Sequence, residues 1–299
     1  MGSSYRRTFY TIILFALVVA AVGCAPEPAE APDAGEQAGP VTGTVASADG
    51  VKIAYTSAGS GSPAIVFIHG GFADQSFWSE QVPLAETYRL VTLDLAGHGA
   101  SGSERETWSM DAFGEDVRAV VEALELDAVV LVGNSLGGPV GLNVAQKLPD
   151  RVRGLIAVDT LQDVQSEWPE EQRDAFVQAM RDDFDGTCKM MVRQLLLEGT
   201  DEELYAWIEG EMCSFDPEVA LGILGDVFEH ELAPAFAGSE IPIRAILGEI
   251  TPLNLEGNRE LHPDFDAVVM EGCGHYPQLE NPAEFNRHLV AYVEELQGR

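Results

Sequence analysis

Four short runs of apolar residues recur along the chain and alternate with segments of helical spacing. The runs cover residues 64–68, 90–93, 128–132 and 155–158. A strand that is buried on both faces lacks polar alternation, so each run predicts a strand of a parallel sheet that is covered on both sides. The apolar residues of segments 110–124 and 140–148 share one helical face. The alternation therefore predicts an α/β fold with a mostly parallel, doubly wound sheet.

The alternation stops between residues 160 and 238. Apolar residues there recur only at helical spacing, which predicts an inserted cap of about four helices. The strand pattern resumes at residues 241–247 and 267–270, and a helix is predicted from Pro282 to Leu296. We therefore predict a core formed by residues 44–159 and 239–299, and a helical cap formed by residues 160–238. A strand-like pattern is also present from Val41.

The first residues have the pattern of a secretory signal. Arg6 and Arg7 precede an apolar stretch at 9–22, and the small residues before Cys24 resemble the lipobox of bacterial lipoproteins. We predict a lipoprotein signal peptide at 1–23 and lipidation of Cys24. The alternative is an uncleaved membrane anchor, although the apolar stretch is shorter than the ~20 residues that span a bilayer.

The segment that follows is rich in Pro, Ala, Glu and Gly and has no apolar face to bury. We predict that residues 24–43 form a disordered tether between the lipid and the domain. The protein would then be exported and anchored by lipid to the bacterial cell envelope.

Export changes the interpretation of the cysteines. Cys188 and Cys213 lie in one helical region and can pair in an oxidising compartment; two buried thiols are the alternative. Cys273 would remain free. The six histidines lack the spacing of metal ligands, so we expect neither a metal nor an organic cofactor.

Charge narrows the class of partner. The chain has 49 acidic and 17 basic residues, a formal net charge of −32. Such a chain repels nucleic acid, and the lack of a strongly basic cluster argues against a highly anionic substrate. A small molecule is therefore the expected partner.

Ser135 is the candidate nucleophile. It lies in Gly133-Asn-Ser-Leu-Gly137, between a predicted strand and a predicted helix. A serine on such a sharp turn exposes its hydroxyl at the carboxyl edge of the sheet. A structural turn is the alternative interpretation.

A serine hydroxyl needs a base and, in acyl transfer, donors for the oxyanion. His275 follows the last apolar run and hence lies at the same sheet edge as Ser135. The backbone N–H of Leu136 is the first expected donor. The second comes from the His-Gly-Gly-Phe turn at 69–72, with Gly71 preferred and Phe72 as the alternative.

These motifs together resemble the α/β-hydrolase superfamily with a cap. The resemblance rests on four segments in the expected order: His-Gly-Gly at 69–71, Asp-Leu-Ala-Gly-His-Gly-Ala-Ser at 94–101, Gly-Asn-Ser-Leu-Gly-Gly at 133–138 and Gly-Cys-Gly-His-Tyr-Pro at 272–277. It covers about residues 44–299. It implies the fold strongly and the substrate poorly, because this fold hosts esterases, lipases, C–C hydrolases, haloperoxidases and receptors.

One element departs from that pattern. In such hydrolases the acid usually follows the strand that here covers 241–247, but Thr251 occupies its position and carries no charge. The acid must be an anion, since it orients the histidine and stabilises the imidazolium. Asp159, after the preceding strand, is our first candidate. Glu249 is the alternative, and Asp163 or no acid at all remain open.

The resulting hypothesis is a serine hydrolase that cleaves a carboxylic ester or related acyl substrate through an acyl-enzyme. One alternative is a ligand-binding or sensory protein that keeps the same residues but turns over slowly. Another is a C–C bond hydrolase that uses the same serine.

The lipidation hypothesis makes a prediction about membrane association. Cys24→Ser removes the thiol that would carry the lipid, so the variant should leave the membrane fraction and appear in the soluble fraction after export. Fractionation of cells that express each form measures this. Continued membrane retention of the variant would support a spanning segment instead.

Overall fold

The computed structural model describes residues 39–166 and 168–298. The predicted signal peptide, Cys24 and residues 24–38 of the predicted tether lie outside the described residues. Within the described part, none of the helices has the length and apolar character that crossing a membrane requires.

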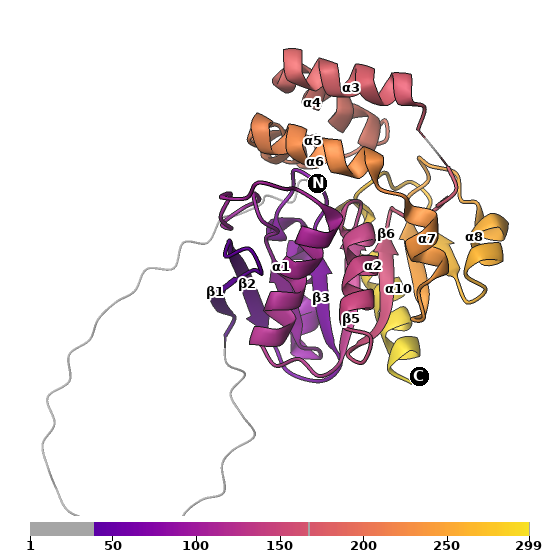
Figure 1. The fold of residues 1–299 in the computed structure, drawn as a ribbon. Helices are drawn as coiled ribbons and strands as arrows, with labels where there is room; N and C mark the ends of the chain where they lie inside the picture. Colours follow the sequence, from indigo (N-terminus) through magenta and orange to yellow (C-terminus); the bar gives the residue numbers. More distant parts are fainter. Residues whose placement is uncertain (1–38, 167, 299) are drawn as a thin grey trace, which may run out of the picture. The chain divides into compact units, whose positions relative to one another are not determined.

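A sheet of eight strands forms the centre of the described domain (Figure 1). The strands are β1 (Val41–Ala46), β2 (Lys52–Ala58), β3 (Ala64–Ile68), β4 (Leu90–Leu93), β5 (Val129–Asn134), β6 (Val152–Val158), β7 (Ile243–Leu247) and β8 (Asp266–Val269). Their order is β1-β2-β4-β3-β5-β6-β7-β8. Only β2 pairs antiparallel, with β1 and β4, so the mostly parallel sheet is as predicted. Strand β1 begins at Val41, which corrects the tether boundary: residues 41–43 belong to the sheet.

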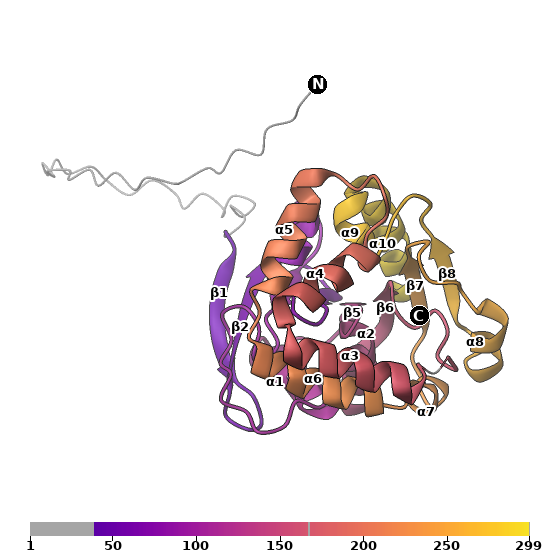
Figure 2. The ribbon, with the colours of Figure 1, turned by 90° about the horizontal axis from the view of Figure 1, so that it is seen from above.

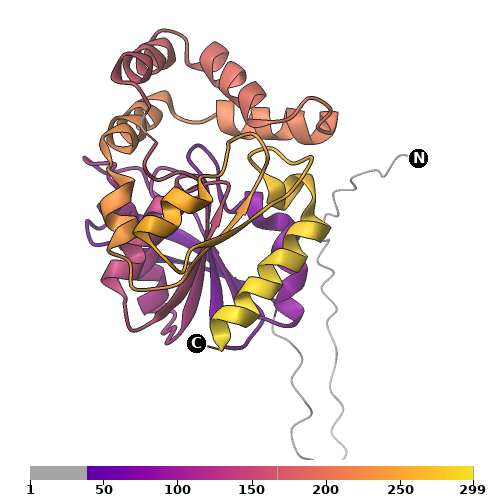
Figure 3. The same ribbon diagram turned by 90° about the vertical axis from the view of Figure 1, so that its right-hand side faces the viewer.

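Helices cover both faces of the sheet (Figure 3). One face packs against α1 (Met110–Ala123) and α2 (Gly137–Lys147), and the other packs against α10 (Pro282–Gln297) and the 3₁₀ helix η1 (Gln75–Glu86). Successive residues of β5 alternate between the two cores, with Leu131 in one and Val130 and Val132 in the other. This burial on both sides is the reason that the strand is a continuous apolar run.

Residues 170–229 form four helices above the carboxyl edge of the sheet (Figures 1 and 2). They are α3 (Glu170–Asp182), α4 (Phe184–Leu195), α5 (Glu202–Cys213) and α6 (Pro217–Glu229). Aspartates 183, 201 and 216 cap the first N–H groups of α4, α5 and α6, which explains where these helices begin.

The end of the insertion differs from the prediction. Helix α7 (Leu232–Ala237) falls inside the predicted cap at 160–238, yet it packs against α2 and against α8 (Leu255–Leu261) of the core. Its Phe236 is fully buried in the main core. The four-helix cap therefore ends near Glu229, and α7 belongs to the sheet domain.

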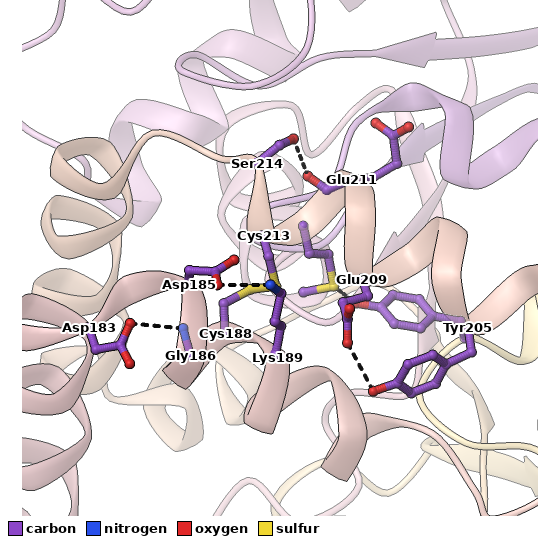
Figure 4. Close-up of a disulfide and its surroundings, with 12 residues drawn as sticks. Asp183, Asp185, Gly186, Cys188, Lys189, Tyr205, Glu209, Glu211, Cys213 and Ser214 are labelled. Atoms are coloured by element: carbon purple, nitrogen blue, oxygen red, sulfur yellow. Dashed lines mark hydrogen bonds and ion pairs between the residues drawn. A yellow bond between two sulfur atoms is a disulfide. The ribbon is translucent and has the colours of Figure 1, made fainter. Parts of the chain in front are cut away.

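A disulfide joins two of the cap helices (Figure 4). Cys188 of α4 pairs with Cys213 of α5, with 5.6 Å between their Cα atoms. Cys273 is free and buried. Of the two alternatives left open by the sequence, the structure has the disulfide.

We expect this disulfide to stabilise the domain. A crosslink over 25 residues restricts the unfolded chain, so Cys188→Ser/Cys213→Ser should lower the free energy of unfolding by about 3 kcal/mol. Denaturant unfolding with and without dithiothreitol measures this. Reductant should destabilise the wild type and Cys273→Ser but leave the double variant unaffected; a wild type that is equally stable in reductant would contradict the prediction.

Candidate functional site

Ser135 lies at the turn between β5 and α2. Its φ of 52° is in the left-handed region, which a non-glycine residue adopts only where its surroundings impose it. A Cβ at Gly133 would collide with the carbonyl oxygen of Gly137, so the tight turn requires the glycine. The Ser135 side chain is partly exposed although the strand before it is buried. The turn thus presents a hydroxyl at the sheet edge, as the sequence predicts.

Asp159 and His275 are hydrogen-bonded to each other. Asp159 Oδ2 lies 2.6 Å from His275 Nδ1, and Asp159 Oδ1 accepts the Gly248 N–H at 2.8 Å. The side chain of Asp159 is only 1% exposed and that of His275 is 13% exposed. The buried carboxylate therefore holds one nitrogen of the imidazole, and Nε2 has no hydrogen-bond partner among the described residues.

The other acid candidates lie elsewhere. Glu249 is exposed, and its Oε2 accepts the N–H of Gly272 at 3.0 Å. Asp163 Oδ1 accepts from the side chain of Asn254 at 3.2 Å, at the entry to the cap. Thr251 is exposed in the loop after β7. Of the acids considered from the sequence, only Asp159 contacts the ring of His275 within the described residues.

Asn134 connects the segments that carry the three candidate residues. Its Nδ2 donates to the carbonyl oxygen of Val158 at 3.0 Å, next to Asp159, and to that of His275 at 3.1 Å. Asn134 is 1% exposed and directly precedes Ser135. One buried amide therefore links the serine turn, the end of β6 and the histidine loop. The sequence motif contains this residue, but the local sequence carries no signal for its two distant partners.

The turn at 69–72 is held by two buried histidines, His69 and His98, whose ring centroids lie 4.8 Å apart with the ring planes tilted by 52°. His69 Nε2 accepts the Leu95 N–H at 3.0 Å, and His98 Nε2 accepts the Phe72 N–H at 3.3 Å. Burial lowers the pKa of His69, and burial together with the neighbouring His69 holds the pKa of His98 well below its usual value. Both rings are thus neutral and able to accept, and their role is structural.

One of the two expected oxyanion donors, Gly71, lies in this turn, and the other, Leu136, directly follows Ser135. Phe72 N–H is already engaged by His98. The N–H groups of Gly71 and Leu136 donate no hydrogen bond to any other described residue. A Cβ added at Gly71 would lie 3.9 Å from Leu136 Cδ2, so the two residues are neighbours. The two unused donors are therefore on adjoining segments.

Cap aromatics reach down to this turn. The ring of Phe72 lies 6.1 Å from Phe184 and 5.1 Å from Phe215, and Phe77 of η1 lies 4.8 Å from Trp207. These contacts join cap and core, and they bring apolar surface next to the candidate oxyanion donors.

Comparisons with known proteins identify several relatives of this chain. The pimeloyl-[acyl-carrier protein] methyl ester esterase of Yersinia pseudotuberculosis is 26% identical over 82% of this chain and 98% of its own. The karrikin insensitive 2 receptor CA of Petunia hybrida is 25% identical over 80% of this chain and 93% of its own. The solved structure of Est816, described as an N-acyl homoserine lactone degrading enzyme, has a TM-score of 0.74 and 27% identity, and it covers 84% of this chain and all of that one.

Other relatives are longer. The dihydrolipoyllysine-residue acetyltransferase component of the acetoin cleaving system of Pseudomonas putida is 28% identical over 79% of this chain, and the chain spans only 64% of its length. The family match itself covers residues 65–288, which include every candidate residue from Gly71 to His275. The chain therefore belongs to the alpha/beta hydrolase family and has esterase-like neighbours within it.

Proposed function

We propose that this protein is a serine hydrolase that cleaves a carboxylic ester or a related acyl substrate. The observation that carries the proposal is the 2.6 Å hydrogen bond between His275 Nδ1 and Asp159 Oδ2. A carboxylate only accepts, so the proton is on Nδ1 and the lone pair on Nε2. An imidazole in this tautomer can take the proton of a serine hydroxyl.

In the proposed first step, Ser135 Oγ attacks the substrate carbonyl carbon and His275 Nε2 takes the hydroxyl proton. The carbonyl oxygen becomes an oxyanion, which the N–H groups of Leu136 and Gly71 stabilise. The tetrahedral intermediate then expels the alcohol, which receives the proton from His275. An acyl-enzyme ester on Ser135 remains.

In the second step, water replaces the alcohol. The water oxygen attacks the acyl carbon while His275 Nε2 takes a proton from the water. The N–H groups of Leu136 and Gly71 stabilise the new oxyanion. Collapse of this intermediate breaks the bond to Ser135 Oγ, which recovers the proton from His275. Asp159 stays ionised throughout and stabilises the imidazolium formed in each step.

The relatives support an ester or lactone as the substrate class. The Yersinia relative is named as a methyl ester esterase and Est816 as a lactone-degrading enzyme. An ester and a lactone each contain an acyl carbon, the atom that Ser135 attacks in the proposed mechanism. The net charge of −32 favours a neutral substrate over an anionic one.

A ligand-binding protein with slow turnover is the second candidate. The similarity to a Petunia receptor over most of both chains favours it, because that fold can serve signalling as well as catalysis. The two candidates differ in the second step: a binder would release the acyl group slowly.

We also propose that the protein acts outside the cytoplasm, anchored through Cys24. The disulfide between Cys188 and Cys213 supports this location, since such bonds persist in oxidising compartments.

The serine proposal is tested with a fluorophosphonate probe and short p-nitrophenyl esters. The wild type should be labelled and should hydrolyse the esters, while Ser135→Ala should lose labelling and at least about 10⁴-fold in kcat. Equal labelling of both forms would rule out Ser135 as the nucleophile. A burst of one equivalent of p-nitrophenol without steady turnover would favour the binding protein.

The identity of the acid is tested by a matched pair of amide variants. Asp159→Asn keeps the shape but lets the amide favour the wrong imidazole tautomer, so kcat should fall about 10³- to 10⁴-fold. Glu249→Gln removes an exposed carboxylate that contacts only the Gly272 turn, and its kcat should stay near that of the wild type. A collapse of kcat in Glu249→Gln alone would contradict the assignment.

A further inference from the structure

The loop that carries His275 is fixed by neighbours on three sides. The His275 N–H donates to the carbonyl oxygen of Leu195 at 2.8 Å, and the His275 carbonyl oxygen accepts from Asn134. Leu195 is the last residue of α4, where a helix leaves carbonyl groups without partners. The third neighbour is Glu280.

Glu280 brackets the histidine. It is the last residue of the short helix α9 (Pro277–Glu280). Its Oε2 accepts the N–H of Gly274 at 2.9 Å, and its Oε1 accepts the N–H of Tyr276 at 3.0 Å. The two oxygens of one carboxylate thus hold the residues immediately before and after His275.

No described lysine or arginine neutralises the charge of the Glu280 carboxylate through an ion pair. It is partly buried, and it forms no ion pair with a lysine or arginine of the described chain. Burial raises the pKa of Glu280, against the lowering effect of its two N–H donors and of His275. A carboxylate costs more to bury than an amide or hydroxyl that could accept the same bonds. When His275 is protonated, its positive charge favours the ionised form of Glu280.

We propose that Glu280 is a positioning residue for His275, which holds the loop backbone through both carboxylate oxygens and stabilises the imidazolium with its charge. This role rests on the proposed function, in which His275 gains a positive charge twice in each turnover. Asp159 contacts the ring at Nδ1, while Glu280 acts through the backbone on either side. Glu280 itself touches neither the substrate nor the reacting atoms.

Other titratable groups lie near the carboxylate of Glu280. Asp159 and His275 interact electrostatically with Glu280 directly. Cys273 and Tyr276 lie in the same loop. Burial, with the charge of Glu280 as a smaller cause, raises the pKa of the Cys273 thiol to about 11. The same two causes raise the pKa of Tyr276. Both therefore remain uncharged at neutral pH, so removal of Glu280 leaves Asp159 as the anion whose charge acts on the imidazolium at close range.

The test compares Glu280→Gln with Glu271→Gln. The amide of Glu280→Gln offers only one acceptor to the two N–H groups and carries no charge. We expect kcat to fall about 10- to 100-fold, with KM within about twofold of the wild type because the substrate contacts remain. The acidic limb of kcat/KM should move to lower pH, since the imidazolium loses a nearby anion. Glu271 is an exposed glutamate four residues before His275, and its variant should match the wild type in all three measures.

A second measurement does not depend on activity. The resonance of His275 is followed by NMR in protein with ¹⁵N-labelled histidine and is assigned with His275→Gln. It should titrate at lower pH in Glu280→Gln than in the wild type. In Glu271→Gln it should titrate at the wild-type pH. Glu280→Asp keeps the charge on a shorter side chain, so it should restore the titration midpoint but only part of kcat. If Glu280→Gln does not fold, as judged by circular dichroism, Glu280→Asp decides: wild-type kcat in that variant overturns the inference.

Failure of this inference is distinguishable from failure of the proposed function. If the wild type shows no serine-dependent labelling by the fluorophosphonate, the hydrolase proposal fails. If the wild type is labelled and active while Glu280→Gln retains wild-type kcat, acidic limb and His275 titration, only the role of Glu280 is overturned.

Discussion

The site depends on a backbone ladder that continues past the ends of the strands. The Ser135 N–H donates to Val158 of β6, the Asp159 N–H donates to Ile246 of β7, and the Glu249 N–H donates to Cys273 in the histidine loop. Each bond joins the first residues after one strand to the neighbouring segment. Because parallel strands end at the same edge, the ladder places the turns that carry Ser135, Asp159 and His275 at one edge of the sheet although they lie far apart in sequence.

The same ladder explains how the Asp159 carboxylate reaches the loop after the next strand. Strands β6 and β7 are adjacent, and the Asp159 carboxylate extends across to the N–H of Gly248, at the start of the loop after β7. A Cβ at Gly248 would collide with the carbonyl oxygen of Gly274, so the histidine loop approaches that turn closely. An anion from β6 therefore reaches the imidazole, and Thr251 is left without a role in the site.

The features that sequence reasoning recovers are those with a local pattern. Buried parallel strands are continuous apolar runs, and the serine turn combines a strand, a glycine-framed loop and a helix. The 3₁₀ helix η1 contains Pro83 and lacks a clear apolar face, so no helical period marks it. Helix α7 has helical spacing, but its packing on α2 depends on the path of the chain. Leu195 contacts the histidine loop through its carbonyl oxygen, and a backbone contact leaves no preference in the side-chain pattern. The Glu280 carboxylate binds two backbone N–H groups of that loop, which any residue except proline could supply, so the sequence does not mark them.

The cap is part of the site rather than a cover for it. Leu195 at the end of α4 accepts the His275 N–H, and Met212 in α5 accepts the hydroxyl of Tyr276 at 3.0 Å. The disulfide joins these two helices, and Met212 directly precedes Cys213. Loss of the crosslink would therefore act on the residues beside His275 as well as on the cap. Under the proposed function a small displacement of His275 would lower the rate, so the cap helices would contribute to the proposed chemistry by fixing the loop that carries His275.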